Sequence, residues 1–356
     1  MRVKYLYLQN FRNFQKFELS FAPEGAIIFG KNGLGKTNLL EAVSYFAFGK
    51  SFRTNNDLDL IDFSKAFFRI RGKFELNEKE ITIEAAAEKQ KKIIKIDNIN
   101  ISKISELYQY LKTVYFSPVD INIISGAPSF RRDFFDQAIS QHNFQYLAVL
   151  RKYFQVLKQR NALLKNDFNE KEKHSWDLQF IKRGSEVIEF RTRYLEDFRA
   201  LLNEKYSLIT DEKEHVKINY KFSFPSPETE SFLENMREHL DEIEEQEMNA
   251  QRSLFGPHLD DYEFYLNGNS ARRFGSQGQK KSLAITSRLV QANLILKKTT
   301  EFPILIFDDV FAELDKKRIK NIMKILENKH QIFIATPNRE IYKSLELPLI
   351  DLEKIK

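Results

Sequence analysis

Residues 30–37 read Gly30-Lys31-Asn32-Gly33-Leu34-Gly35-Lys36-Thr37, and this stretch decides how the rest of the chain is interpreted. It matches the pattern G-x-x-x-x-G-K-S/T at every fixed position. The apolar run 26–29 before it predicts a buried strand, and residues 38–43 after it predict an amphipathic helix. Glycines let backbone N–H groups turn toward an anion, and a helix N-terminus adds partial positive charge. The sequence therefore predicts a site for the phosphates of a nucleoside triphosphate.

Individual residues of this P-loop have predictable roles. The Lys36 ammonium would reach the β- and γ-phosphates and assist catalysis, while the Thr37 hydroxyl would ligate Mg²⁺. Residues 30–35 and the following Asn38 would line the nucleotide.

The composition is that of an ordinary globular protein. Of the 356 residues, 42% are hydrophobic and 30% are charged. The length allows two domains, or one large domain with an insertion. No apolar run is long enough to cross a membrane, and Arg2 and Lys4 stand where a signal peptide would need an apolar core. Because cysteine is absent, disulfides and thiolate metal sites are excluded. We expect a cytoplasmic protein without a membrane partner.

The charge balance is compatible with nucleic acid as a partner but does not establish it. Lys and Arg number 56 against 50 Asp and Glu, a net charge of +6. Arg69, Arg71 and Lys73 alternate with apolar residues and give one strand a cationic face. That face is either solvated or in contact with phosphates, and the sequence leaves both interpretations open.

The pattern of apolar residues predicts three segments. Residues 1–120 form the N-terminal half of an ATPase head, with strands at 3–8, 14–21 and 26–29 and an antiparallel meander at 67–97. Residues 121–245 form an inserted helical lobe, in which two long helices, the second at about 176–209, are joined by the polar stretch 166–174. A strand at 216–222 and an acidic helix at 231–246 follow.

Residues 246–356 return to an α/β pattern and form the C-terminal half of the head. Strands are expected at 261–266, 304–307 and 331–335, the last of them final in the chain, with helices at 277–296 and 316–327. Two α/β segments separated by a helical insertion imply one nucleotide-binding sheet assembled from both ends of the chain.

A second acidic motif follows the apolar run 304–307. Asp308 ends this predicted strand, where an aspartate of a P-loop ATPase holds Mg²⁺. Asp309 comes next, where a carboxylate would position or deprotonate the attacking water. We expect Asp308 to be a metal ligand and Asp309 to be catalytic.

A small polar loop, Ser276-Gln277-Gly278-Gln279, opens the helix that leads to this strand. The chain order of P-loop, this loop, the Asp308-Asp309 pair and then Glu313-Leu314-Asp315 is typical of ABC-type ATPases. In those proteins the serine–glycine loop of one subunit closes over the triphosphate held by the other. The predicted fold is therefore α/β: an ABC-type P-loop ATPase head, with a mixed sheet and an antiparallel β meander, carrying an inserted helical arm.

Two further residues have open roles. Arg53 lies in a polar turn close downstream of the P-loop, where its guanidinium would bridge ATP or DNA. His258 follows Gly256-Pro257 and is either a catalytic or sensor residue or a hydrogen-bonded turn residue.

Over essentially its full length the chain resembles the RecF family of bacterial recombination mediators, relatives of the SMC-type ATPases. The motifs that carry the resemblance are Leu8-Gln9-Asn10-Phe11-Arg12-Asn13-Phe14, Gly35-Lys36-Thr37-Asn38, Lys50-Ser51-Phe52-Arg53-Thr54, Phe116-Ser117-Pro118, Arg131-Arg132-Asp133-Phe134-Phe135-Asp136, Gln159-Arg160-Asn161, Gly256-Pro257-His258-Leu259-Asp260-Asp261, Ser276-Gln277-Gly278-Gln279 and Asp308-Asp309-Val310-Phe311.

The resemblance implies ATP and Mg²⁺ as cofactors, ATP-dependent homodimerisation and slow, DNA-stimulated ATP hydrolysis. It also implies binding of double-stranded DNA and of gapped or single-stranded DNA, and co-operation with RecR and RecO. The task would be loading RecA at gaps in recombinational repair and the SOS response. By position, Ser276 and Gly278 would contact the partner's γ-phosphate.

Two other functions remain alternatives. An SMC-like chromosome-structural head would need a longer heptad coiled coil than the insertion offers. A transporter ATPase would need a surface that couples to a membrane protein, which the basic meander does not suggest.

Overall fold

The computed structural model describes residues 1–54, 56–89, 91–166, 169–210, 214–225, 231–314, 316–326, 330–337 and 347–355. The chain divides into two compact units. The first comprises Met1–Val119, Leu208–Thr210 and Gln291–Lys356, and the second Asp120–Ser207 and Asp211–Val290. Residues 246–290 thus group with the helical lobe in this division, and the three-segment division of the sequence stays a prediction.

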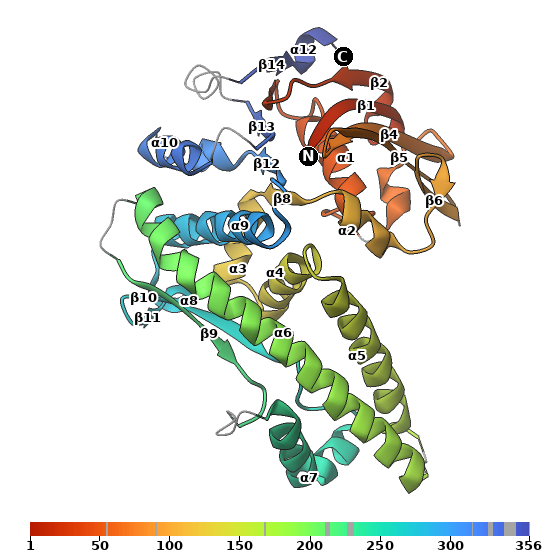
Figure 1. Cartoon of the computed structure of the whole chain (residues 1–356), viewed down its shortest axis with the longest axis vertical. Coiled ribbons are helices and arrows are strands. Elements are labelled where there is room, and N and C mark those ends of the chain that lie inside the picture. The colour runs from red at the N-terminus through yellow and green to blue at the C-terminus, as the bar shows by residue number, and fades with distance from the viewer. Residues whose placement is uncertain are drawn as a thin grey trace. The chain divides into compact units, whose positions relative to one another are not determined.

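A parallel sheet carries the P-loop in the first unit (Figure 1). Its strands, in spatial order, are β14 (Leu349–Asp351), β3 (Gly25–Phe29), β13 (Ile332–Thr336), β12 (Ile304–Asp308) and β8 (Thr113–Phe116). Each pairing in the sheet is parallel. Every residue of β3, β13, β12 and β8 is buried, which explains why these strands are continuous apolar runs.

The edge strand β14 corrects one prediction. β13 was expected to be the last strand, but Leu349–Asp351 pair with Ile27–Phe29 of β3 farther along the chain. These three residues are exposed or only partly buried and give no recognisable pattern, so the pairing depends on the finished sheet.

An antiparallel sheet forms the other layer of the first unit. Its strands, in spatial order, are β2 (Phe14–Ser20), β1 (Arg2–Phe11), β4 (Phe67–Leu76), β5 (Lys79–Glu88), β6 (Lys91–Ile96) and β7 (Ile99–Asn100). The β4–β5 turn has φ of 48° at Asn77 and 65° at Glu78, the left-handed geometry that suits a tight hairpin. The predicted meander is confirmed.

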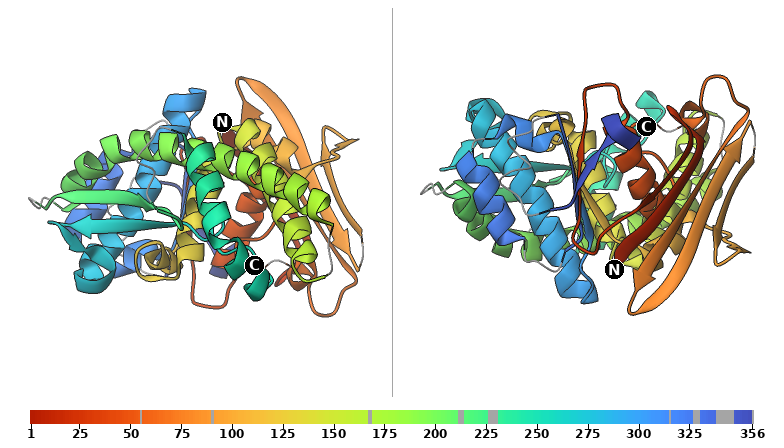
Figure 2. Two further views of the ribbon diagram at one scale, coloured as in Figure 1. Left: turned by 90° about the horizontal axis from the view of Figure 1, so that it is seen from below. Right: turned by 90° about the horizontal axis from the view of Figure 1, so that it is seen from above.

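The P-loop helix α1 (Lys36–Phe48) lies between these two sheets, as the right view of Figure 2 shows. Eleven of its 13 residues are buried. One core cluster joins Val43 of α1 to Leu8 and Ile70 of the antiparallel sheet and to Ile28 and Phe333 of the parallel sheet. The prediction of an amphipathic helix is wrong for this reason: sheets cover α1 on both sides, so it is buried all round.

The other α-helices in the described part of the first unit are short: α2 (Leu107–Tyr110), α10 (Lys316–Ile325) and α12 (Leu352–Ile355). No helix in the described part of the chain combines the length and the apolar character that crossing a bilayer requires.

The second unit is mostly helical. Its helices are α3 (Asn122–Ser125), α4 (Pro128–Ser140), α5 (Phe144–Leu163), α6 (Glu170–Thr210), α7 (Phe232–Ala250), α8 (Ala271–Phe274) and α9 (Gln277–Thr299), of which α6 and α9 run on into the first unit. Strands β11 (Asn269–Ser270), β10 (Asp261–Leu266) and β9 (Val216–Lys221) form a small antiparallel sheet.

The boundaries of the lobe differ from the prediction at two places. A separate helix, α4, precedes the two long ones, and α6 begins at Glu170 rather than near Trp176. Residues 170–174 of the polar stretch that was expected to be a linker are therefore helical. Lys173 stabilises this part of α6 by pairing with Asp177 one turn later and with Glu244 of α7.

Two buried arginines hold the lobe together. Arg160 itself, and the Asp136 and Pro257 partners of Arg191, belong to motifs quoted in the sequence analysis. Arg191 of α6 donates to both carboxylate oxygens of Asp136 at 2.9 Å and to the Pro257 carbonyl at 2.6 Å. Arg160 of α5 donates to Asp177 at 2.7 Å and to Glu247 at 2.6 Å. Buried guanidinium groups need such complete pairing.

Candidate functional site

The P-loop has the strand–turn–helix geometry that the sequence predicts. It leaves β3 at Phe29 and enters α1 at Lys36. Gly33 and Gly35 have φ of 86° and 105°, values that residues with side chains rarely adopt. A Cβ at Gly35 would lie 2.6 Å from Asn13 Oδ1, so this position is closed to larger residues. The loop thus brings its backbone to the N-terminus of α1.

The Lys36 side chain folds back across the loop. Its Nζ donates to the Gly30 carbonyl at 2.8 Å, the Lys31 carbonyl at 3.2 Å and Asn32 Oδ1 at 3.4 Å. Only 6% of the residue is exposed. An ammonium has three rotatable donors, so it can exchange neutral acceptors for phosphate oxygens without leaving the loop.

Thr37 and Asp308 meet at the carboxyl edge of the parallel sheet. The Thr37 hydroxyl donates to Asp308 Oδ1 at 2.9 Å. The Tyr115 hydroxyl of β8 donates to Asp308 Oδ2 at 2.6 Å and fixes the carboxylate from the other side. Tyr115 was not predicted as a site residue, although its place near the end of the short strand before Pro118 was a usable indication.

Asp309 follows directly in a left-handed conformation, with φ of 54°. Its N–H donates to the Ala335 carbonyl at 3.1 Å, while its buried Oδ1 has no hydrogen-bond partner within the described residues. Burial raises the pKa of this carboxyl, the charge of Asp308 raises it further, and Lys36 opposes both. A carboxyl with a raised pKa and a free oxygen is suited to accept a proton.

The oxygens of Thr37 and Asp308 fit a magnesium ion, which prefers hydroxyl, carboxylate and water oxygens. Within the described residues, no three His, Cys, Asp or Glu side chains converge as a ready-made metal cage. A P-loop site does not require one, because water and phosphate oxygens complete the coordination of Mg²⁺.

A charged centre behind the P-loop was missed by the sequence analysis. Glu41 of α1 is fully buried, and its carboxylate accepts hydrogen bonds from Arg12 at 2.8 and 2.9 Å and from the Ser51 hydroxyl. Arg53 lies 3.4 Å from the same carboxylate and donates to Asn38 Oδ1 at 2.8 Å. Asn38 in turn donates to Asn13 Oδ1 at 2.9 Å. Two of the motifs that carry the resemblance to the RecF family, around Arg12 and Arg53, thus converge on the P-loop helix.

The loop Ser276-Gln277-Gly278-Gln279 lies in the second unit, at the start of α9. Gln279 Oε1 accepts from the Ser276 N–H at 2.7 Å, and Ser276 Oγ accepts from the Gln279 N–H at 3.2 Å. This reciprocal pair is a capping box, which satisfies the first N–H groups of the helix and fixes the loop. Ser276 and Gln277 are exposed. Of the predicted segment 313–315, Asp315 lies outside the described residues.

His258 is a hydrogen-bonded turn residue, one of the two roles that the sequence left open. Its Nδ1 lies 2.7 Å from the hydroxyl of the buried Tyr153. Burial lowers the pKa of His258 to about 4, and Arg132 contributes in the same direction.

Comparisons of the sequence identify relatives of this chain. The family model RecF/RecN/SMC N terminal domain matches residues 2–349. A "DNA replication and repair protein RecF" of Heliobacterium modesticaldum is 33% identical over 100% of this chain and 98% of its own length. A protein of the same name from Clostridium perfringens is 33% identical over 97% of this chain and 96% of its own length.

Comparisons with solved structures point to the same family. The chain is similar to the solved recombination mediator protein RecF-ATPrS of the RecFOR pathway, with a TM-score of 0.88, 31% identity and coverage of 95% of this chain and 93% of that one. An SMC head bound to the winged-helix domain of ScpA has a TM-score of 0.56 at 15% identity over 100% of both chains, which shows a shared fold alone. The fold is that of an SMC-type ABC ATPase head, and the chain belongs to the RecF family.

Proposed function

We propose that this protein is an ATP-dependent DNA-binding protein of recombinational repair, in which nucleotide binding and slow hydrolysis act as a switch. The observation that carries the proposal is the hydrogen bond between Thr37 and Asp308, which joins the P-loop to the end of β12. The full-length similarity to DNA replication and repair proteins and to RecF-ATP supports the cellular task.

In this proposal the nucleotide phosphates lie against the backbone of residues 30–38. Lys36 turns from its three loop acceptors to the β- and γ-phosphates, and the N-terminus of α1 adds its dipole. Thr37 and Asp308 hold Mg²⁺, which supplies electrostatic stabilisation of charge on the phosphates. Tyr115 keeps the Asp308 carboxylate oriented.

Asp309 is the proposed base. Its Oδ1, which has no hydrogen-bond partner among the described residues, would position a water molecule and take its proton when the terminal phosphate is attacked. ABC ATPases commonly have the longer glutamate at this place. Aspartate reaches less far, so we expect turnover well below the median enzyme rate of about 10 per second.

The second half of each site comes from another copy of the chain. The capped and exposed Ser276 loop at the N-terminus of α9 is suited to contact a γ-phosphate through Ser276 and the Gly278 backbone. ATP would thus join two copies, and the dimer would hold duplex DNA next to a single-stranded gap. RecR and RecO are the proposed protein partners.

Sedimentation velocity tests the proposal. The protein is run with Mg²⁺-ATP, with Mg²⁺-ADP and without nucleotide, each with and without gapped duplex DNA, beside Lys36→Ala and Ser276→Arg variants. We expect a dimer only with ATP, lost in both variants, that retains DNA better than the ADP form. A protein that stays monomeric and binds DNA equally in all three states would disprove the composite site.

A further inference from the structure

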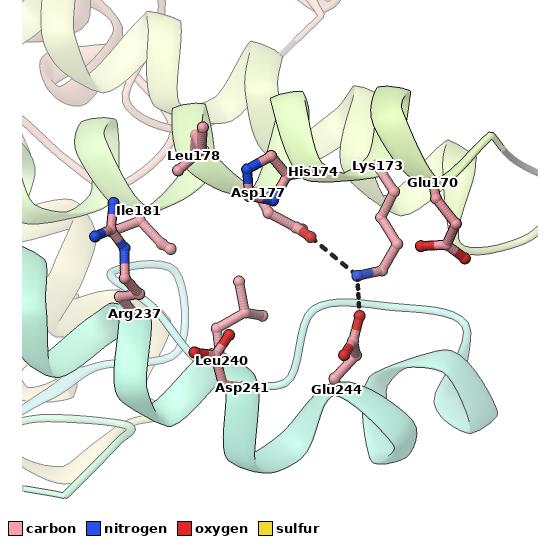
Figure 3. A pocket seen from close by; sticks show the side chains of 10 residues that line it. All are labelled: Glu170, Lys173, His174, Asp177, Leu178, Ile181, Arg237, Leu240, Asp241 and Glu244. Atoms are coloured by element: carbon pink, nitrogen blue, oxygen red, sulfur yellow. Dashed lines mark hydrogen bonds and ion pairs between the residues drawn. The ribbon is translucent and has the colours of Figure 1, made fainter.

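A pocket of about 600 Å³ lies in the second unit, between the beginning of α6 and the middle of α7 (Figure 3). Its volume is in the range of about 300–1,000 Å³ that ligand pockets occupy. None of its residues belongs to the P-loop, the Asp308-Asp309 pair or the Ser276 loop. The pocket therefore needs an explanation of its own.

The pocket is acidic although the chain is cationic. Four carboxylates line it against two cations, so with a neutral His174 its charge is −2, whereas the chain carries +6. The wall formed by α7 continues this character, because that helix has seven acidic residues and one arginine. A surface of this sign repels the phosphates of nucleic acid and attracts cations.

Two of the carboxylates are free to bind a ligand. Asp177 pairs with Lys173 at 3.0 Å and with Arg160 at 2.7 Å, and Glu244 pairs with Lys173, so both acids already have cationic partners. Glu170 of α6 and Asp241 of α7 have no hydrogen-bond or ion-pair partner within the described part of the chain. One free carboxylate thus stands on each helix.

The apolar lining shows what kind of cation fits. Ile181 and Leu240 are buried in the floor, while Leu178 is 40% exposed. In Figure 3, Ile181 and Leu240 lie in the space between the two helices, and Leu178 lies on α6. Lysine and arginine side chains have this combination of a hydrocarbon stem and a charged end.

We propose that the pocket binds a lysine or arginine side chain from a basic segment of a partner protein. The stem would pack on Leu178 and Leu240, and the cationic end would pair with Asp241 or Glu170. A protein segment is favoured over a small polyamine because acidic residues continue along the exposed side of α7, beyond the pocket, at Glu238, Glu242 and Glu245. Further cations on the same segment would pair there.

Fluorescence anisotropy with the full-length protein tests this interaction. The probe is a fluorescein-labelled helical peptide of alternating arginine, leucine and alanine, with a twin that carries glutamate in place of arginine. The pocket variant is Glu170→Lys with Asp241→Lys. The matched control is Glu189→Lys with Glu196→Lys, which makes the same charge change on exposed residues of α6 outside the pocket.

We expect the arginine peptide to bind and the glutamate peptide not to bind. The pocket variant should weaken binding about tenfold, and the control variant less than about threefold, because screened surface charges contribute little. Leu178→Ser should weaken binding without any charge change. Unchanged thermal melting of the variants shows that the fold is kept.

Other outcomes overturn the proposal. Equal weakening by both charge variants would mean that the peptide binds any acidic surface. Competition by spermidine at the peptide's own affinity would identify a polyamine site, and self-association that the pocket variant abolishes would identify a second copy as the occupant. Lys36→Ala should bind the peptide normally, so failure of the nucleotide switch and failure of this pocket are distinguishable.

Discussion

The Thr37 hydroxyl donates a hydrogen bond of 2.9 Å to Asp308 Oδ1, although 271 positions separate the two residues in the chain. They meet because β3 and β12 are parallel to the same intervening strand, β13, so that both carboxyl ends lie at one edge of the sheet. Asp308 is further held by Tyr115 from β8. Three segments distant in sequence therefore determine where the proposed Mg²⁺ would lie.

Tyr115→Phe should weaken the proposed metal site without unfolding it. The substitution removes the 2.6 Å hydrogen bond to Asp308 Oδ2 but keeps the ring in place against Phe52. Loss of such an orienting partner typically lowers metal affinity or activity by about 10- to 100-fold. Titration of Mg²⁺ against ATP hydrolysis should show a higher requirement for Mg²⁺. Asp308→Asn is the reference for complete loss, and an unchanged titration in Tyr115→Phe would show that Tyr115 does not orient the ligand.

Asp309→Asn should abolish hydrolysis while leaving ATP binding intact, because the amide cannot accept the proton from water. The raised pKa of Asp309 also predicts a pH dependence. Activity should fall as the pH drops through this raised pKa, since the protonated carboxyl is no longer a base. The effect of pH on stability has the opposite sign. Because the pKa of Asp309 is higher in the folded than in the unfolded protein, the folded protein loses stability as the pH rises through the interval between the two values. Asp309→Asn should therefore melt slightly higher than the parent protein at neutral pH.

Single-turnover hydrolysis and nucleotide binding, measured separately, check the assignment of Asp309. Asp309→Glu is the informative companion, because it restores the longer carboxylate. Hydrolysis that persists at the parent rate in Asp309→Asn would transfer the role of base to another group.

The parts of the site that could be predicted from sequence are those formed by consecutive residues. The P-loop combines glycines, Lys36 and Thr37 in one stretch, and the Asp308-Asp309 pair directly follows an apolar run. The capping box of Ser276 and Gln279 could also have been predicted from its spacing.

The parts that could not be predicted depend on partners far away in the chain. Glu41 looks like a solvent-facing residue of a helix, and only the approach of Arg12 and Ser51 makes it a buried centre. The start of α6 looks like a linker until Glu244 of α7 pairs with Lys173. Neither contact can be predicted from the residues that neighbour Glu41 or Lys173 in the sequence.

Glu41→Ala should destabilise the first unit strongly. It removes a buried carboxylate and leaves Arg12, whose side chain is only 19% exposed, without its charged partner. Breaking a buried pair in this way typically costs about 3–5 kcal/mol. Arg53→Ala should cost about 0–1 kcal/mol, because the Arg53 side chain is 44% exposed and its contact with Glu41 is long.

Urea unfolding of Glu41→Ala, Arg12→Ala and Arg53→Ala separates structure from function. If Arg53 contacts nucleotide or DNA, its alanine variant should keep nearly normal stability but lose ATP or DNA affinity. If Arg53→Ala binds ATP and DNA as tightly as the parent protein, Arg53 contacts neither ligand and serves only through its contacts with Asn38 and Glu41.

His258 should make the stability of the protein depend on pH in the mildly acidic range. Burial beside Tyr153 lowers its folded-state pKa to about 4, whereas the ordinary value is 6.5. Between these values the unfolded chain binds the proton and the folded chain does not, so stability is fully present above pH 6.5 and is lost as pH falls toward 4. Over the whole interval the loss amounts to about 3 kcal/mol. Urea unfolding at a series of pH values should show His258→Gln with a shallower slope than the parent. Equal slopes in the two proteins would rule out His258 as the titrating group.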